Sequence, residues 1–193
     1  MLLPPMLETS EKLTEQYGDT IEFVIPVADT IDYQHVANSI AECSANITLI
    51  DPTDYKQLRS CDVALVASGT ATLELTVLGV PMVVIYKLKP LSYKVLKRWL
   101  TIEHISLVNI IANKRVVPEL LQDDVSVDNL CTELNTLLND KKARDAQITG
   151  LTSVHKQLGK SGASVTTAEL IVSLVTENLS NKTGTEDRDV ALS

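Results

Sequence analysis

The residues best suited to chemistry in this sequence are Ser68, Gly69, Thr70 and Glu74, which follow a short apolar run. The next segment predicts a helix, and a helix N-terminus offers free N–H groups and partial positive charge to a phosphate. Gly69 lets a ligand approach the backbone, and Ser68 and Thr70 are of the types that cap free N–H groups. Glu74 is expected on the same helix face as Thr70, about 6 Å further along.

This spacing suits a nucleotide, because a phosphate at the helix start and a ribose beside Glu74 would be about one helical turn apart. The carboxylate would accept hydrogen bonds from the two ribose hydroxyls. The residues alone also allow a simpler interpretation, in which the helix is capped by its own hydroxyl groups and Glu74 is only solvated.

Asn109 and Asn113 form a second candidate. Each amide carries donors and acceptors that suit a phosphate, a base or a sugar. Asparagine is also a common turn residue, so turn formation is an equally good explanation of this pair.

Residues 87–101, KLKPLSYKVLKRWLT, combine five basic side chains with apolar ones and contain no acidic residue. A basic amphipathic helix with a tryptophan near its end is typical of segments that lie on a membrane surface. Lys94, Lys97, Arg98 and Trp99 are therefore expected to face a membrane. The alternative is a surface helix whose lysines are simply solvated.

The composition excludes several classes of protein. A formal net charge of −8 argues against a nucleic-acid partner. The cysteines and histidines, three of each, are scattered without metal or redox spacing, so we expect a cytoplasmic protein with no metal site and no cofactor. No apolar run approaches the roughly 18 residues needed to cross a bilayer.

Strand and helix patterns alternate along the chain, which is typical of a doubly wound, Rossmann-like α/β fold with a parallel sheet. The patterns predict strands at residues 21–27, 47–50, 63–67, 81–86 and 105–108, and helices at 1–17, 29–45, 52–60, 70–78, 127–138, 141–158 and 163–179, with a further helix start at 118–121. The first strand of such a fold lies in the middle of the sheet, yet this pattern opens with a helix. We therefore expect the sheet to lack its first strand or to receive it from elsewhere.

Three blocks of this sequence together resemble lipid-A-disaccharide synthase, a family of two-domain GT-B glycosyltransferases. The blocks are Ser68-Gly69-Thr70-Ala71-Thr72-Leu73-Glu74, Gly79-Val80-Pro81-Met82-Val83-Val84, and Asn109-Ile110-Ile111-Ala112-Asn113 with Pro118-Glu119-Leu120-Leu121-Gln122. The first block alone is weak evidence for this family, since other GT-B enzymes and sugar-nucleotide epimerases carry similar runs. The three blocks in this order and at these separations are specific to the family.

The resemblance implies transfer of 2,3-diacylglucosamine from UDP to lipid X, which is 2,3-diacylglucosamine 1-phosphate, with release of UDP. It implies that UDP-2,3-diacylglucosamine is bound by Ser68, Gly69, Thr70, Ala71, Thr72, Glu74, Asn109 and Asn113. The protein would act as a peripheral protein on the cytoplasmic surface of the inner membrane, because both substrates are lipids.

This sequence also departs from the family pattern. Family members are about twice as long, and their second domain opens with a strand and a Gly-Ser-Arg phosphate loop that is absent here. The chain thus resembles the C-terminal, donor-binding half of a GT-B fold. The catalytic base is expected in the missing N-terminal domain, so no residue of this chain is assigned a catalytic role.

We expect residues 1–162 to form a truncated UDP-sugar-binding domain, followed by a helix at 163–179 and a disordered tail at 180–193. A separate N-terminal half or a second copy of the chain are candidate partners. The alternatives are a UDP-sugar epimerase on the same fold, and a non-catalytic module that binds UDP or lipid.

Overall fold

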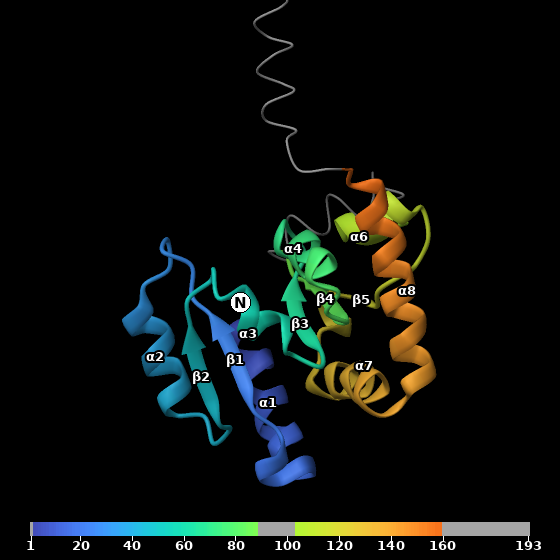
Figure 1. The fold of residues 1–193 in the computed structure, drawn as a ribbon. Coiled ribbons are helices and arrows are strands. Elements are labelled where there is room, and N and C mark those ends of the chain that lie inside the picture. Colours follow the sequence, from blue (N-terminus) through green and yellow to red (C-terminus); the bar gives the residue numbers. More distant parts are fainter. Residues whose placement is uncertain (1, 89–102, 160–193) are drawn as a thin grey trace, which may run out of the picture. The chain divides into compact units, whose positions relative to one another are not determined.

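The computed structural model describes residues 2–88 and 103–159. Within it, Met1–Gln157 form one compact unit (Figure 1). Lys94, Lys97, Arg98 and Trp99, the helix expected at 163–179 and the tail expected at 180–193 lie outside the described residues. The membrane-facing segment therefore stays a prediction.

The elements alternate along the chain as the sequence predicts (Figure 1). The strands are β1 (Phe23–Pro26), β2 (Ile47–Ile50), β3 (Ala64–Ala67), β4 (Met82–Tyr86) and β5 (Glu119–Leu121). The α-helices are α1 (Leu3–Tyr17), α2 (Tyr33–Ala41), α3 (Tyr55–Arg59), α4 (Ala71–Leu78), α6 (Leu107–Ala112), α7 (Val127–Asn139) and α8 (Lys141–Gln157). Two short 3₁₀ helices, Gly18–Thr20 and Gln122–Asp124, complete the described elements.

All five strands run parallel to their neighbours, but they form two sheets rather than one. One sheet pairs β1 with β2, so that Phe23 lies opposite Ile47. The other has the order β3-β4-β5. The parallel strands and alternating helices confirm the α/β class, and no described strand joins β1 to β3.

The core lies on both faces of β4. On one face, Val83 and Ile85 pack with Leu13 of α1 and with several apolar residues of α7. On the other face, Met82 and Val84 pack with apolar side chains of α4, α6 and α8. Buried on both faces, β4 is continuously apolar, as the central strand of a parallel sheet must be.

The structure corrects two predicted elements. Residues 105–108 were predicted as a strand, but Ser106 caps α6, which begins at Leu107. Residues 118–121 were predicted as a helix start, but Glu119–Leu121 form β5, which pairs with β4. Both runs are short, and a short apolar run has no periodicity that separates strand from helix. The hydroxyl group of Ser106, which caps α6, explains why the first run leads into a helix.

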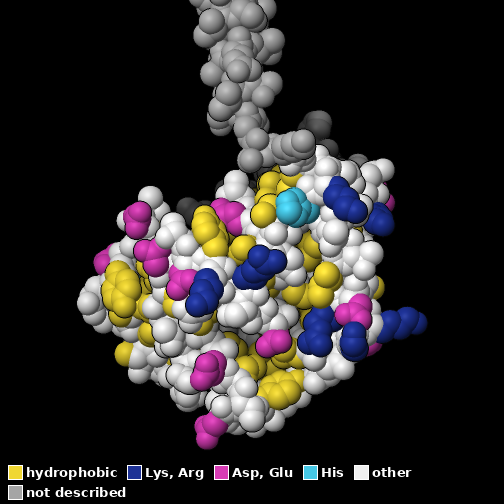
Figure 2. Space-filling model, in the orientation of Figure 1, with side chains coloured by type: hydrophobic (Ala, Val, Ile, Leu, Met, Phe, Trp, Pro, Cys, Tyr) yellow, Lys and Arg dark blue, Asp and Glu magenta, His cyan; other side chains and the backbone are white. Residues whose placement is uncertain are grey.

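Both signs of charge occur on the molecular surface. Figure 2 shows acidic side chains over the side formed by α2 and β2, and Lys and Arg side chains over the centre and the side formed by α8. Within the described residues, no helix is long and apolar enough to cross a membrane.

Candidate functional site

The candidate site lies at the edge of the second sheet where its strands end. Because β3, β4 and β5 are parallel and in register, their carboxyl ends lie at one edge. Ser68 follows β3, Lys87 follows β4 and Gln122 follows β5 at this edge. Ligands of doubly wound folds bind outside the carboxyl ends of the strands, so the structure puts the predicted Ser68–Glu74 segment in the expected place.

The N-terminus of α4 is not capped by a side chain. Thr70 has helical backbone angles, and its side chain makes no capping hydrogen bond. The hydroxyl group of Ser68 donates instead to the carbonyl of Ile105, at 3.1 Å. The expectation that these two hydroxyls cap the helix is therefore wrong. Ser68 ties the end of β3 to the segment that precedes α6.

The first N–H groups of α4 remain open as a result. The N–H of Thr72 donates to the carbonyl of Gly69 at 3.2 Å, and the N–H of Leu73 to the carbonyl of Thr70 at 2.9 Å. Among the described residues, the N–H groups of Thr70 and Ala71 find no backbone or side-chain acceptor. Both residues are exposed. These donors, with the positive end of the helix dipole behind them, can bind an anion.

Gly69 is not required by the protein's own packing. A Cβ atom added there would meet nothing within 4 Å, and the backbone at Gly69 is not in the left-handed region. The space above the backbone at the helix start is thus open to solvent. An approaching ligand could use it.

Glu74 lies one turn further along α4, as predicted. Its N–H donates to the carbonyl of Thr70 at 3.2 Å, and its side chain is exposed. Its carboxylate makes no hydrogen bond or ion pair with any described residue, which leaves it free for a polar ligand. Thr72 differs, because it is fully buried and its hydroxyl donates to the carbonyl of Gly69 at 2.7 Å. Thr72 therefore stabilises the start of α4 by a hydrogen bond within the protein.

The N-terminus of α6 lies at the same edge and is bound in part by protein groups. The carboxylate of Glu119 accepts hydrogen bonds from the N–H groups of Ile105, at 3.0 Å, and Ser106, at 2.8 Å. The hydroxyl of Ser106 accepts from the N–H of Asn109 at 3.2 Å. A carboxylate at a helix N-terminus is stabilised by the dipole and the free donors. Sequence reasoning missed this role of Glu119, although the residue stood in the third block.

Asn109 of α6 takes part in the same hydrogen-bond network as Glu119. Its amide donates to Glu119 at 2.8 Å and to the carbonyl of Val117 at 2.9 Å. Its amide oxygen accepts from the N–H groups of Val116 and Val117, at 2.6 and 3.0 Å. The side chain is fully buried. The hydrogen-bonding positions of Asn109 are thus occupied within the protein, and its contact with the donor stays a prediction.

Asn113 lies at the opposite end of α6. It ends the helix in the left-handed conformation, with a φ of 50°, and its side chain is exposed. Asparagine tolerates this conformation better than most residues, so turn formation explains its presence. The structure places Asn113 at the C-terminal end of α6, and its contact with the donor stays a prediction.

Gln122, the last residue of the third block, faces the segment after β4. It is largely buried, with a φ of 51°. With its amide oriented to satisfy both partners, it accepts from the N–H of Leu88 at 2.8 Å and donates to the carbonyl of Leu88 at 3.2 Å. Gln122 thereby fixes the backbone where the chain leaves the sheet toward residues 89–102.

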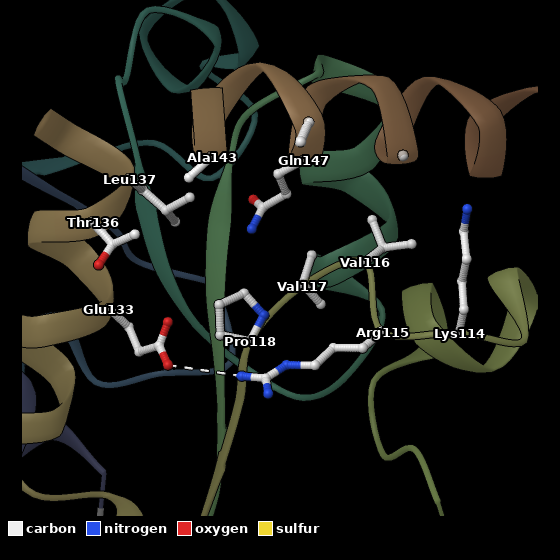
Figure 3. A pocket seen from close by; sticks show the side chains of 12 residues that line it. Lys114, Arg115, Val116, Val117, Pro118, Glu133, Thr136, Leu137, Ala143 and Gln147 are labelled. Atoms are coloured by element: carbon white, nitrogen blue, oxygen red, sulfur yellow. Dashed lines mark ion pairs between the residues drawn. The ribbon is translucent and has the colours of Figure 1, made fainter. Parts of the chain in front are cut away.

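A cavity of about 370 Å³ lies elsewhere, between residues 114–118, which precede β5, and the helices α7 and α8 (Figure 3). Val116, Pro118 and Leu137 form part of its wall, and Arg115 reaches across it to Glu133, with 3.7 Å between the charged atoms. None of the predicted site residues lines it. Within the described part of the chain, no group of His, Cys, Asp and Glu side chains is arranged to hold a metal ion.

Comparison with known proteins identifies the family. The family model described as lipid-A-disaccharide synthetase matches residues 1–172. Curated relatives named lipid-A-disaccharide synthase include one from Geobacter sulfurreducens, 37% identical over 174 residues, and one from Anaeromyxobacter dehalogenans strain 2CP-C, 42% identical over 175 residues. Each alignment covers 90% of this chain and 45% of the relative, so the chain spans about half the length of these relatives.

Among solved structures, the chain is similar to spinosyn forosaminyltransferase SpnP, with a TM-score of 0.55 and 16% identity over 90% of this chain and 38% of that one. This likeness supports the Rossmann-like fold and, at this identity, nothing beyond it. The match of the family model over most of the sequence shows that the chain belongs to the lipid-A-disaccharide synthetase family.

Proposed function

We propose that this chain binds the UDP part of UDP-2,3-diacylglucosamine and contributes the donor half of a lipid A glycosyltransferase site. The observation that carries the proposal is the open N-terminus of α4, where the N–H groups of Thr70 and Ala71 have no acceptor among the described residues. The neighbouring N-terminus of α6 already holds the carboxylate of Glu119. The N–H groups of Thr70 and Ala71 are thus available to an external anion, and the UDP pyrophosphate fits their chemistry.

Glu74 is the proposed ribose contact. Its exposed carboxylate lies one turn from the open donors, on the same helix. A carboxylate accepts hydrogen bonds from two adjacent hydroxyl groups, as a ribose presents them. Ser68, Thr72 and Asn109 support this arrangement from within the protein rather than by direct contact.

In the proposed reaction, a hydroxyl oxygen of lipid X attacks the anomeric carbon of the donor sugar. The bond from that carbon to the UDP oxygen breaks, and UDP leaves with the bonding electrons. The hydroxyl proton passes to a base that lies outside this chain. The helix dipole of α4 stabilises the departing UDP by about 0.3–2 kcal/mol, which assists the transfer without accounting for catalysis.

The proposal includes a location and partners. A polypeptide that carries the other half of the site would complete it, and the cytoplasmic surface of the inner membrane would present both lipid substrates. Residues 87–101 would contact that surface through Lys94, Lys97, Arg98 and Trp99.

The test is UDP binding to the 193-residue chain, measured by calorimetry. Glu74→Ala is expected to weaken UDP binding about tenfold, and Gly69→Asp, which puts a negative charge on the open helix start, by more than tenfold. Glu15→Ala, which removes an exposed carboxylate from α1, is the matched control and should leave UDP affinity unchanged. Equal affinity of the unmodified chain and both α4 variants would refute the proposed site.

A further inference from the structure

The cavity between residues 114–118, α7 and α8, here called the α8 cavity, has the size and lining of a small-molecule site (Figure 3). Its volume of about 370 Å³ lies within the range of such sites. Apolar side chains form much of its wall, namely Val116, Val117, Pro118, Leu137, Ala143 and Ala146. An occupant would therefore bury an apolar body against them.

Direct contacts hold the walls of the α8 cavity in place. A Cβ atom added at Gly150 would lie 2.6 Å from Cγ1 of Val116, so the backbone of α8 lies against this side chain. The amide oxygen of Gln147 accepts from the N–H of Met82 at 2.6 Å, which ties α8 to β4. Asn109 accepts from the N–H of Val116, also at 2.6 Å, which ties the facing wall to α6. The α8 cavity is thus formed before any ligand binds, as most small-molecule sites are.

One buried polar group is directed into this cavity without a partner. Gln147 is only 5% exposed, and the bond from Met82 to its amide oxygen fixes which way the amide faces. Its amide nitrogen, Nε2, donates to no acceptor among the described residues. Figure 3 shows this nitrogen directed across the cavity toward the ring of Pro118, which offers no acceptor. Because an unpaired buried donor costs free energy, an acceptor group of a ligand would be favoured here.

The charged side chains that line the α8 cavity are positive on balance. Lys114 and Arg115 are cations, and Glu133 is the one acidic residue of the lining. The charged atoms of Arg115 and Glu133 are 3.7 Å apart, and the Arg115 side chain is 67% exposed, so this pairing is weak. Its guanidinium therefore keeps donors and positive charge for a ligand. With one positive charge in excess, the cavity suits a ligand with a single negative charge.

We propose that the α8 cavity binds a small monocarboxylate with an apolar body, such as the anion of a short fatty acid. The carboxylate accepts from Nε2 of Gln147 in the positive field of Lys114 and Arg115. The apolar body lies against Pro118 and Leu137. None of the residues proposed to bind UDP lines this cavity, so the two sites are separate and this one goes beyond the proposed function.

The test is an NMR titration of the isotope-labelled 193-residue chain with hexanoate, read at the side-chain amide of Gln147 and the backbone amides of Val116 and Val117. Two further probes separate the parts of the ligand. Acetate keeps the charge without the apolar body, and methyl hexanoate keeps the body and a carbonyl acceptor without the charge. Hexanoate should shift the three signals saturably at millimolar concentration, as expected for so small a ligand. Each control probe should bind at least tenfold more weakly.

Two variants test the site itself. Ala143→Leu, which fills the cavity from α8, should weaken hexanoate binding more than tenfold. Arg115→Gln, at an exposed and weakly paired position, should weaken it about threefold without disturbing the fold. The matched control is Arg59→Gln, which removes an exposed arginine of α3 that does not line the cavity and should leave hexanoate affinity unchanged.

Three results would overturn the proposal. If tens of millimolar hexanoate left the Gln147 amide signal unmoved, water alone would meet this donor. If methyl hexanoate bound as tightly as hexanoate, the cavity would take a neutral acyl group rather than a carboxylate. If the shifts were confined to Thr70 and Ala71 and UDP displaced the hexanoate, the anion would bind at the start of α4 and not in the α8 cavity.

Discussion

The N-termini of α4 and α6 lie at the same edge of one sheet and are treated in opposite ways. At α6, Glu119 and Ser106 accept hydrogen bonds from the N–H groups of Ile105, Ser106 and Asn109. At α4, Thr70 provides no cap and the first N–H groups stay open. A helix end without partners costs free energy, and α4 bears this cost at the N–H groups of Thr70 and Ala71.

The difference teaches where an external anion fits. At α6 a protein carboxylate accepts from backbone N–H groups, whereas at α4 no described side chain does so beside the exposed Glu74. The closed start also has a structural purpose, because Glu119 and Asn109 join β5 to the segment that receives the hydroxyl of Ser68. Protein groups tie the start of α6 into the sheet edge, and the start of α4 is the proposed phosphate site.

The largest expected effect is a loss of stability when Asn109 of α6 is replaced. Asn109→Ala removes four hydrogen bonds from a fully buried position and leaves the N–H groups of Val116 and Val117 unpaired. We expect the free energy of unfolding to fall by about 3 kcal/mol. Denaturant unfolding measures it, and Asn113→Gly, at the exposed left-handed position, should change stability by less than about 0.5 kcal/mol. Equal effects of the two substitutions would contradict the assigned roles.

Glu119→Gln tests the closing carboxylate with little change of shape. The amide offers one acceptor oxygen where the carboxylate used both, so one of the N–H groups of Ile105, Ser106 or Asn109 loses its partner. We expect a loss of about 2 kcal/mol, again measured by denaturant unfolding. The matched control is Glu133→Gln, whose pairing with Arg115 spans 3.7 Å at the surface and should contribute less than about 1 kcal/mol.

These two asparagines and this glutamate also show what sequence reasoning could reach. Alternating strands and helices, the end of α4 at Gly79 and the ligand edge followed from local patterns, because apolar periodicity and a left-handed glycine are local signals. Asn109 and Asn113 are the same residue type in one short helix. Only the return of residues 116–119 along the sheet makes the first a core residue, and no local pattern records that.

Short apolar runs are the second limit on predicting this fold from its sequence. Residues 105–108 and 119–121 are both too brief to show a period, so their states were exchanged in the prediction. Pairing with β4 decides the strand, and the cap at Ser106 decides the helix. The split sheet was foreseeable from the order of elements.

Gly69→Asp would make the open start resemble the closed one. The new side chain has space, and a carboxylate there can accept from the first N–H groups of α4. We expect the unfolding free energy to rise by about 1 kcal/mol at low salt while UDP binding falls. Gly69→Asn, a cap without charge, separates capping from charge and should keep more of the UDP affinity. A loss of stability in both variants would mean that the helix start is not open.

The smallest expected effect is that of Thr70→Ala. Because Thr70 makes no capping hydrogen bond and is exposed, the substitution should change the unfolding free energy by less than about 0.5 kcal/mol. The equivalent substitution at the closed start, Ser106→Ala, removes a cap from a fully buried position and should cost about 1 kcal/mol. Thermal unfolding of the two variants side by side measures the difference. If Thr70→Ala were as costly as Ser106→Ala, the hydroxyl of Thr70 would be closing α4, and the vacancy on which the proposed phosphate site depends would not exist.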